Sequence, residues 1–174
     1  MAEIISGKNL LLFFRERSKH ETEDGSKLRF QTEHSISKAK ESEATITKDG
    51  VINTISDGEN TAEVTSLAYV DDQETITTWE TLEDCFDRGA LMEIWEVDIT
   101  NVTTENMAVK PTYYQGYFTD YEKSAPADGK VELSFSLALN GNGVKGEDTL
   151  TAGQLDAVQS AVYEYEKIAQ ETGA

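Results

Sequence analysis

The sequence predicts a mainly β protein, an antiparallel β-sandwich or partial barrel with one packing helix at about 77–88 and a C-terminal helix at about 151–169. Two observations carry this prediction. Apolar and polar residues alternate along several segments, as in half-buried strands, and two other segments place apolar residues at helical spacing. The chain has 174 residues, the length of one compact domain. We therefore expect residues 1–174 to form a single domain with a projecting hairpin at about 41–61.

The clearest strand is predicted over Val131–Leu139, where five apolar residues alternate with small or polar ones. A weaker alternation over Arg29–Ser37 predicts a second strand with one polar side. Further strands are expected at Leu10–Glu16, Ala62–Val70, Leu91–Ile99 and Thr112–Tyr121. On the two alternating strands, the polar sides carry Glu132, Ser134, Ser136, Glu33 and Gln31.

A hairpin is predicted around Asp49-Gly50, because this dipeptide readily supplies the two positive φ values of a type I′ turn. The flanking arms, Ala44–Lys48 and Val51–Ile55, contain few apolar residues. An isolated two-stranded hairpin is only marginally stable in water, so we expect this one to fold back or to contact a partner. The residues assigned to that contact are Ala44, Ile46, Thr47, Lys48, Asp49, Gly50, Val51, Ile52 and Ile55.

Two segments have helical patterns. Over Thr77–Arg88, Thr77 and Glu80 have the spacing of a capping box, and Gly89 can end the helix. The apolar face that would pack on the core consists of Trp79, Leu82, Cys85 and Phe86. The second helix is expected to begin at Thr151, with an apolar stripe that extends to Ile168.

The chain is strongly acidic, with 33 Asp and Glu against 15 Lys and Arg and a net charge of −18. Residues 1–50 are balanced, so the excess acid lies entirely in residues 51–174. Such a chain should not bind the phosphates of duplex DNA. The alternative interpretation of the acidity is that it simply keeps the protein soluble. The longest apolar run, Leu10–Phe14, is too short to span a bilayer, and we expect no membrane partner.

The composition argues against catalysis and against a bound cofactor or metal. The chain has one cysteine and two histidines, with no second His or Cys at ligand spacing. Residues 141–146 match the GxGxxG pattern, but the next helix begins too late to meet a pyrophosphate, so we interpret them as a hairpin or loop. The tyrosine-rich run Tyr113–Tyr121 is interpreted as an aromatic strand with a bulge at Gly116, and a sugar-binding platform is the alternative.

Short motifs follow one another in a fixed order over most of the chain, among them Ser6–Leu10, Phe30–Ser35, Thr47–Gly50, Tyr114–Tyr117, Lys123–Pro126 and Gly146–Gln154. Together they resemble the major tail (tail tube) proteins of bacteriophages with long, non-contractile tails that infect Gram-positive hosts. No single motif is diagnostic. The resemblance rests on the order and spacing of several weak ones.

The resemblance implies a structural virion protein, made in the host cytoplasm, whose hexameric rings stack into the tail tube. One sheet per subunit would line the lumen through Glu132, Ser134, Ser136, Glu33 and Gln31, and the hairpin would contact the neighbouring ring. The implied partners are copies of itself, other tail proteins at the tube ends, and passing double-stranded DNA that is not tightly bound. The alternative is a monomeric β-sandwich module that binds a protein or a glycan.

Overall fold

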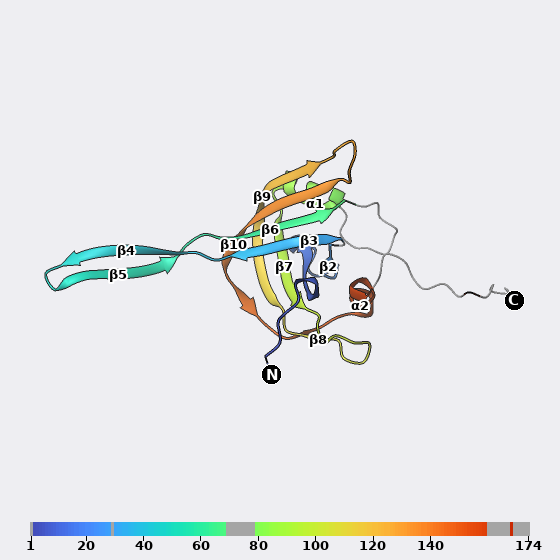
Figure 1. Cartoon of the computed structure of the whole chain (residues 1–174), viewed down its shortest axis with the longest axis horizontal. Helices are drawn as coiled ribbons and strands as arrows, with labels where there is room; N and C mark the ends of the chain where they lie inside the picture. The colour runs from blue at the N-terminus through green and yellow to red at the C-terminus, as the bar shows by residue number, and fades with distance from the viewer. Residues whose placement is uncertain (1, 29, 69–78, 160–167, 169–174) are drawn as a thin grey trace.

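The computed structural model describes residues 2–28, 30–68, 79–159 and 168. The fold is mainly β, as predicted, and consists of a curled seven-stranded antiparallel sheet, two separate two-stranded sheets and two helices (Figure 1). The strands are β1 Leu10–Glu16, β2 Ser26–Lys27, β3 Gln31–Ser37, β4 Lys40–Thr47, β5 Gly50–Asp57, β6 Asn60–Leu67, β7 Leu91–Asp98, β8 Ala108–Val109, β9 Thr112–Ser124, β10 Glu132–Lys145 and β11 Asp148–Thr149. The helices are α1 Trp79–Arg88 and α2 Ala152–Gln159, with short 3₁₀ turns at Gly7–Asn9 and Arg17–Lys19.

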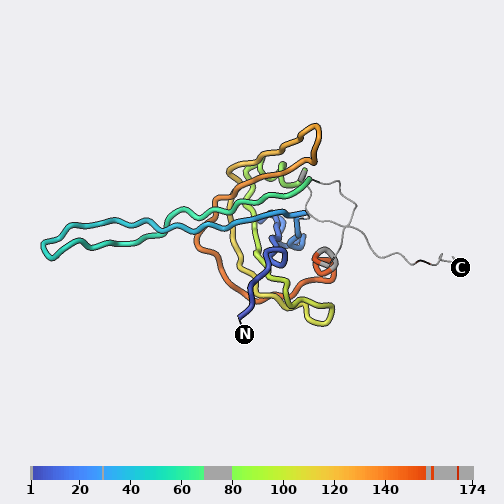
Figure 2. The backbone as a smooth tube through the Cα atoms, in the orientation of Figure 1, coloured from blue at the N-terminus to red at the C-terminus, as the bar shows by residue number. Residues whose placement is uncertain are grey.

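The large sheet has the strand order β2-β1-β7-β9-β10-β6-β3 and curls so far that its two ends approach each other (Figure 2). Side chains bridge the remaining gap. The Gln31 amide of β3 donates to the carbonyl oxygen of Leu12 in β1 at 2.9 Å and accepts a bond from the Leu12 N–H at 3.2 Å. His34 Nε2 lies 2.9 Å from Glu96 Oε2 on β7. The sheet is therefore a partial barrel, closed along one seam by side chains instead of backbone bonds.

Curling divides the apolar residues into two cores because successive side chains of a strand point to opposite faces. The inner core lies inside the curl, where α1 covers it, and consists of Leu12, Phe14, Leu28, Ala62, Val64, Leu82, Cys85, Met92, Ile94, Tyr114, Phe135, Leu137 and Leu139. The outer core lies on the other face of β1 and β7, against the β8–β11 pair and α2. Its buried members are Leu11, Phe13, Val97, Val109 and Leu150.

Strands β9 and β10 are longer than the sequence pattern predicts, and both contain irregularities. The glycine-rich residues 141–146 do not form a loop; most of them belong to β10. There the pairing with β9 shifts register between Asn140 and Val144, and Gly141 and Gly143 have φ of 70° and 82°. An apolar/polar pattern ends at such a bulge, although the backbone pairing resumes beyond it. This is why the predicted strand stops at Leu139.

Helix α1 ends at Arg88, as the sequence predicts, and α2 begins directly after the predicted capping residue Thr151. Leu82 and Cys85 of α1 are buried in the inner core, and the ring of Phe86 lies 6.0 Å from that of Tyr121 on β9. Residues 77 and 78 and the side chain of Trp79 lie outside the described part of the chain. In α2, Thr151 and Gln154 exchange the two bonds of a capping box, at 2.9 and 3.2 Å. Residues 160–167 are not described, and Ile168 is 99% exposed, so the predicted stripe does not extend to it.

The predicted hairpin is formed by β4 and β5, which pair only with each other and project far from the body of the molecule (Figure 1). It spans 40–57, because Asn60 and Thr61 already belong to β6 of the large sheet. Residues 69 and 70, at the end of the strand predicted over Ala62–Val70, lie outside the described residues. Within the described residues, neither helix is long and apolar enough to cross a membrane.

Gly116 lets β9 and β10 approach each other closely, which gives a testable prediction. A Cβ at this position would lie 2.3 Å from the carbonyl oxygen of Ala138 on β10. We expect Gly116→Ala to lower the free energy of unfolding by about 3 kcal/mol, measured by urea denaturation. Gly146→Ala is the matched control, since nothing lies within 4 Å of its added Cβ. Equal stability of the two variants would contradict the prediction.

Candidate assembly surfaces

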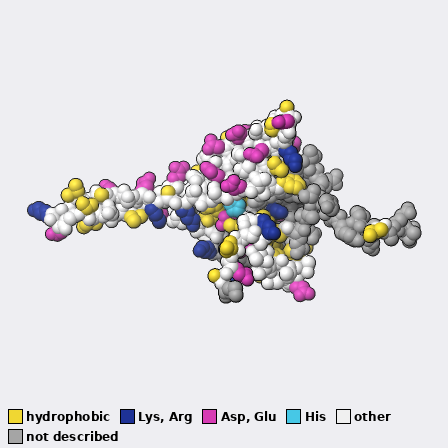
Figure 3. Space-filling model, in the orientation of Figure 1, with side chains coloured by type: hydrophobic (Ala, Val, Ile, Leu, Met, Phe, Trp, Pro, Cys, Tyr) yellow, Lys and Arg dark blue, Asp and Glu magenta, His cyan; other side chains and the backbone are white. Residues whose placement is uncertain are grey.

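One half of the outer face of the large sheet is acidic. In an antiparallel sheet, directly paired residues point to the same face. Ser134 pairs with Glu122 on one side and Thr65 on the other, and Thr65 pairs in turn with Glu33. The same register shows that the other carboxylates of β9, β10, β6 and β3 point to this face. We call this surface the acidic face, and its carboxylates are Glu33, Glu63, Asp120, Glu122 and Glu132 (Figure 3).

Small hydroxyl side chains separate the carboxylates on the acidic face. Ser136 stands between Glu63 and Asp120, and Ser134 stands beside Glu122. Like charges directly opposite each other destabilise a sheet, so these serines allow a high density of acid at little cost. By register, the described residues 118–124, 132–138, 61–67 and 33–37 place no Lys or Arg on this face.

Gln31 does not belong to the acidic face. Its register with β6 shifts at Thr32, so that Gln31 pairs with buried Ser66 whereas Glu33 pairs with Thr65. One extra residue reverses the direction of every side chain on one side of it. The Gln31 amide accordingly lies against the inner core and donates to the carbonyl oxygens of Leu12 and Leu28 at 2.9 and 2.8 Å. Simple alternation, which puts Gln31 and Glu33 on one side, is wrong here because of this bulge.

Two strand edges that flank the acidic face have no strand partner among the described residues. Among the described strands, β3 forms backbone pairs with β6 only; the contacts of Gln31 and His34 across the seam are made by their side chains. Strand β9 pairs with β7 only up to Tyr117, and no described strand pairs with its outer edge beyond that residue. The acidic face is thus borne by a four-stranded unit, β9-β10-β6-β3, with an open edge on each side. Open edges are sites where another chain can pair.

The hairpin has an apolar face and a polar face. Register places Ile46 opposite Val51, and along the same face follow Ala44 and Ile55. The exposed fractions of Ile46, Val51 and Ile55 are 85%, 61% and 69%. The charged residues Glu41 and Glu43 lie on the other face, as does Ile52. The chain itself buries none of these aliphatic side chains, so the apolar face is available to another molecule.

A buried ionic cluster lies on the outer face of β1, β7 and β9. Glu93 is 1% exposed, and its carboxylate accepts bonds from Arg15 Nε at 2.9 Å, from Arg17 Nη1 at 3.3 Å and from the Tyr113 hydroxyl. The Arg15 guanidinium also lies 4.9 Å from the centre of the Trp95 ring. Burial raises the pKa of Glu93, but the bonds from Arg15 and Tyr113 outweigh it, so that the pKa is lowered overall. The cluster is fully paired and is a structural element.

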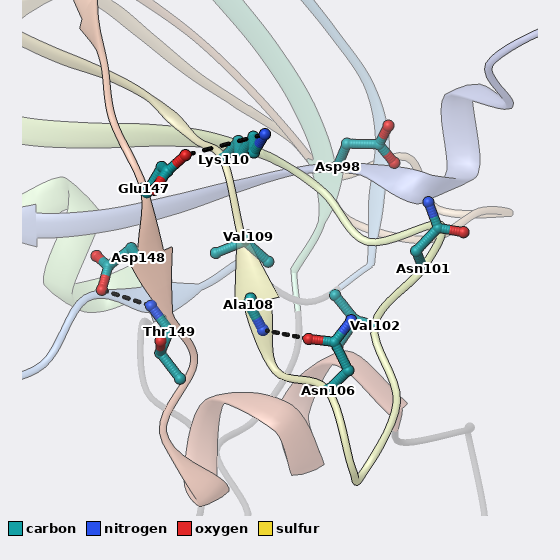
Figure 4. A pocket seen from close by; sticks show the side chains of 10 residues that line it. All are labelled: Asp98, Asn101, Val102, Asn106, Ala108, Val109, Lys110, Glu147, Asp148 and Thr149. Carbon is teal, nitrogen blue, oxygen red and sulfur yellow. Dashed lines mark hydrogen bonds and ion pairs between the residues drawn. The ribbon is translucent and has the colours of Figure 1, made fainter.

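A broad hollow beside β8 and β11 does not have the character of a catalytic site. It has a volume of about 750 Å³ and lies between the loops that flank β8 and β11 (Figure 4). Two of its polar side chains bond to backbone groups nearby in the sequence. Asn106 accepts a hydrogen bond from the Ala108 N–H at 3.3 Å, and Asp148 accepts one from the Thr149 N–H at 2.7 Å. In the described ranges, no three His, Cys, Asp or Glu side chains are grouped so that they could hold a metal ion.

The tyrosines of β9 do not form a common exposed platform. Tyr114 is buried in the inner core, Tyr113 bonds to Glu93, and Tyr121 packs beside Phe86. Tyr117 alone among these four is more than a third exposed. The geometry therefore does not favour the sugar-binding alternative.

The described residues form an antiparallel sheet with two unpaired strand edges and a projecting hairpin, which are surfaces to which another chain can add. A family model described as "Phage tail tube protein" matches residues 4–145. The chain belongs to this family. It is accordingly a structural component of the virion tail tube and not an enzyme.

The relatives agree with this assignment. The chain is 26% identical over 167 residues to the "Putative tail protein" of Staphylococcus phage phiMR25, an alignment that covers 95% of this chain and 83% of that protein. Its fold is similar to the subunit of the SPP1 tail tube, with a TM-score of 0.68 at 16% identity over 98% of this chain and 95% of the other. It is also similar to a chain of the native gene transfer agent virion, with a TM-score of 0.55 at 14% identity, covering 83% of this chain and 99% of the other.

The Glu93 cluster predicts how stability depends on pH. Because the folded pKa of Glu93 is below the unfolded value of 4.5, its ionised form stabilises the fold above pH 4.5, and this stabilisation is lost as pH falls through the folded pKa. We expect Glu93→Gln to lower the free energy of unfolding by about 3 kcal/mol at pH 7, and by less near pH 3. Urea denaturation at both pH values tests this. A deficit that does not shrink in acid would contradict it.

Proposed function

We propose that this protein assembles into hexameric rings that stack into the tail tube, and that its acidic face lines the channel through which DNA leaves the virion. The observation that carries the proposal is the four-stranded acidic unit with an open edge on each side. Closing such units around an axis pairs every open edge, as in a β-barrel. The acidic face then covers one side of a continuous wall.

The strand directions within the unit favour this closure. Strands β9, β10, β6 and β3 alternate in direction, so β3 runs opposite to β9. In a cyclic ring, all copies of β9 run the same way. The edge of β3 therefore meets the edge of β9 in the next copy in an antiparallel sense, and the alternation continues unbroken around the ring. A unit with an odd number of strands would force one parallel pair per subunit.

Six copies are supported by a relative of similar fold. A chain in the tail of the gene transfer agent particle, described with C6 symmetry, has a TM-score of 0.54 at 15% identity over 86% of this chain and all of the other. Six four-stranded units would give a wall of about 24 strands, which is wider than the barrels of about 16–18 strands that already leave an aqueous channel, because the diameter grows with strand number. Other tail proteins would bind the hairpins and the ring surfaces that have no neighbouring ring at the two ends of the tube.

The charge of the acidic face suits a channel for DNA. Its five carboxylates per copy, Glu33, Glu63, Asp120, Glu122 and Glu132, repel phosphates across a gap of about one Debye length, ~8 Å at physiological salt. Ser134 and Ser136 add hydroxyl groups without positive charge. Repulsion of this kind prevents the sticking that Lys and Arg would cause along a tube, where many weak contacts add. We therefore expect DNA to pass through the channel without binding tightly to its wall.

The hairpin is the proposed contact between rings, through the residues from Ala44 to Ile55. Ring stacking in one direction is a heterologous contact, in which a surface of one copy meets a different surface of the next. The hairpin extends beyond the body and presents exposed Ile46, Val51 and Ile55, which need such a partner surface. Burying them stabilises the stack and also the hairpin, which has no core of its own.

Assembly is tested by electron microscopy of the concentrated protein. We expect rings and tubes from the wild-type chain, and at least ten-fold fewer tubes from the double variant Ile46→Ser/Val51→Ser, which loses a cross-strand apolar pair. Glu41→Ser/Ser56→Thr, a cross-strand pair on the polar face and outside Ala44–Ile55, is the matched control and should assemble normally. Only monomers of the wild-type chain at all concentrations would overturn the proposed function.

The role of the acidic face is tested by reversing its charge. We expect Glu33→Lys/Glu132→Lys to leave tubes intact, because exposed charges contribute little to stability, and to slow DNA release from particles, most strongly at low salt. Glu21→Lys/Glu105→Lys changes the net charge equally on loops outside the sheet and is the control. DNA release at the wild-type rate in low salt would mean that these carboxylates do not face the channel.

A further inference from the structure

The two outer edges of the hairpin differ in charge. Strand β4 carries Lys40, Glu41 and Glu43, and Lys48 follows it directly. From Val51 to Ser56, by contrast, β5 has no charged residue. Charged side chains on an edge strand discourage the addition of another strand, whereas an uncharged edge rich in β-branched residues invites it. Strand β5 is therefore the unprotected edge of the hairpin.

A second segment has exposed aliphatic side chains and no strand partner. Residues 2–6 precede the first 3₁₀ turn and belong to no helix or strand. Ile4 and Ile5 are 99% and 67% exposed, and Ser6 has the extended backbone angles φ −79° and ψ 129°. Two adjacent exposed isoleucines in an extended segment are costly in water unless another molecule covers them.

The side-chain pattern of this segment matches β5. Consecutive residues of a strand point to opposite faces, so Ile4 and Ile5 would contact both faces of a neighbouring strand. Strand β5 is apolar on both faces, with Val51 and Ile55 on one and Ile52 on the other. Charge favours the same edge, because Glu3 would approach Glu41 and Glu43 beside β4 but meets no carboxylate between Val51 and Ser56.

Other exposed aliphatic and aromatic side chains do not offer an equivalent match. Among the described residues outside the hairpin, the large exposed hydrophobic side chains other than Ile4 and Ile5 are Phe30, Tyr117, Val144 and Ile168, which are scattered. Within one chain, the start of the chain and the hairpin tip lie apart (Figure 1). The partner segment must therefore come from a second copy.

We propose that residues 2–6 of one copy add as a third strand to the free edge of β5 in another copy. This proposal rests on the proposed function, since it names the surface that the hairpin meets in the tube. Main-chain bonds along β5 supply affinity, and the isoleucines supply specificity. Three strands with a shared apolar face are also more stable than the isolated pair, so the contact rigidifies the hairpin.

Disulfide trapping tests this pairing. The native Cys85 is buried and burial raises its pKa, so introduced cysteines react selectively. Chains carrying Glu3→Cys are mixed with chains carrying Asn53→Cys on β5, or with chains carrying Ala44→Cys, its cross-strand neighbour on β4. Because a third strand on β5 lies one strand spacing farther from β4, we expect several-fold more heterodimer with Asn53→Cys. Equal or reversed yields overturn the proposal.

A second measurement separates this proposal from the proposed function. We expect Ile4→Ser/Ile5→Ser to fold normally by circular dichroism, since neither side chain is buried, and to form at least ten-fold fewer tubes than wild type. Val144→Ser, which removes an exposed aliphatic side chain outside both residues 2–6 and the hairpin, is the matched control and should assemble normally. Wild-type yield from the serine variant overturns the strand addition while the tube function stands. If the wild-type chain forms no tubes, the proposed function fails, and the trapping experiment alone decides the pairing.

Discussion

The structure depends on how the backbone groups along open strand edges are satisfied. A sheet that curls without closing leaves edges whose N–H and C=O groups need partners. At the seam, the amide of Gln31 meets the backbone of Leu12, and His34 meets Glu96. Beside the acidic face, no described strand pairs with the outer edge of β3 or with that of β9 beyond Tyr117, and on the hairpin the edge of β5 is uncharged from Val51 to Ser56. The edges that the chain leaves open are those at which we propose assembly.

The outer face of the sheet is used in two different ways. On β1 and β7 it is apolar and is covered by the β8–β11 pair and α2, with Glu93 neutralised by Arg15 and Arg17. On β10, β6 and β3 the same face is acidic and uncovered. The outer face is thus buried by apolar contacts on one half of the sheet and exposed to solvent on the other half. A sheet covered on only one half suits a subunit whose uncovered half faces a channel.

Local patterns predicted most of the elements. Strand β1 begins and ends at the predicted residues, α1 ends at Arg88, and a tight turn joins β4 to β5 as a hairpin. These predictions succeeded because alternation, capping and turn chemistry act over a few neighbouring residues. The turn itself differs from the prediction: Thr47 pairs with Gly50, so the turn residues are Lys48 and Asp49, and of the predicted pair only Gly50 has a positive φ. The same patterns ended β9 and β10 too early and assigned a hairpin or loop to residues 141–146. At a bulge the alternation breaks while the backbone pairing continues, and sequence alternation does not reveal the pairing.

The sequence by itself determined the fold class, the acidity of the chain, the polar side of β10 at Glu132, Ser134 and Ser136, and the position of a hairpin without a core. The tertiary structure decided which surfaces these residues build. Only the register with β6 shows that the bulge at Thr32 turns Gln31 inward while Glu33 stays on the acidic face. Only the pairing of β1 and β9 with β7 brings Arg15, Arg17 and Tyr113 around Glu93. The physical reason is that pairing between strands distant in sequence sets register, and register sets the direction of every side chain.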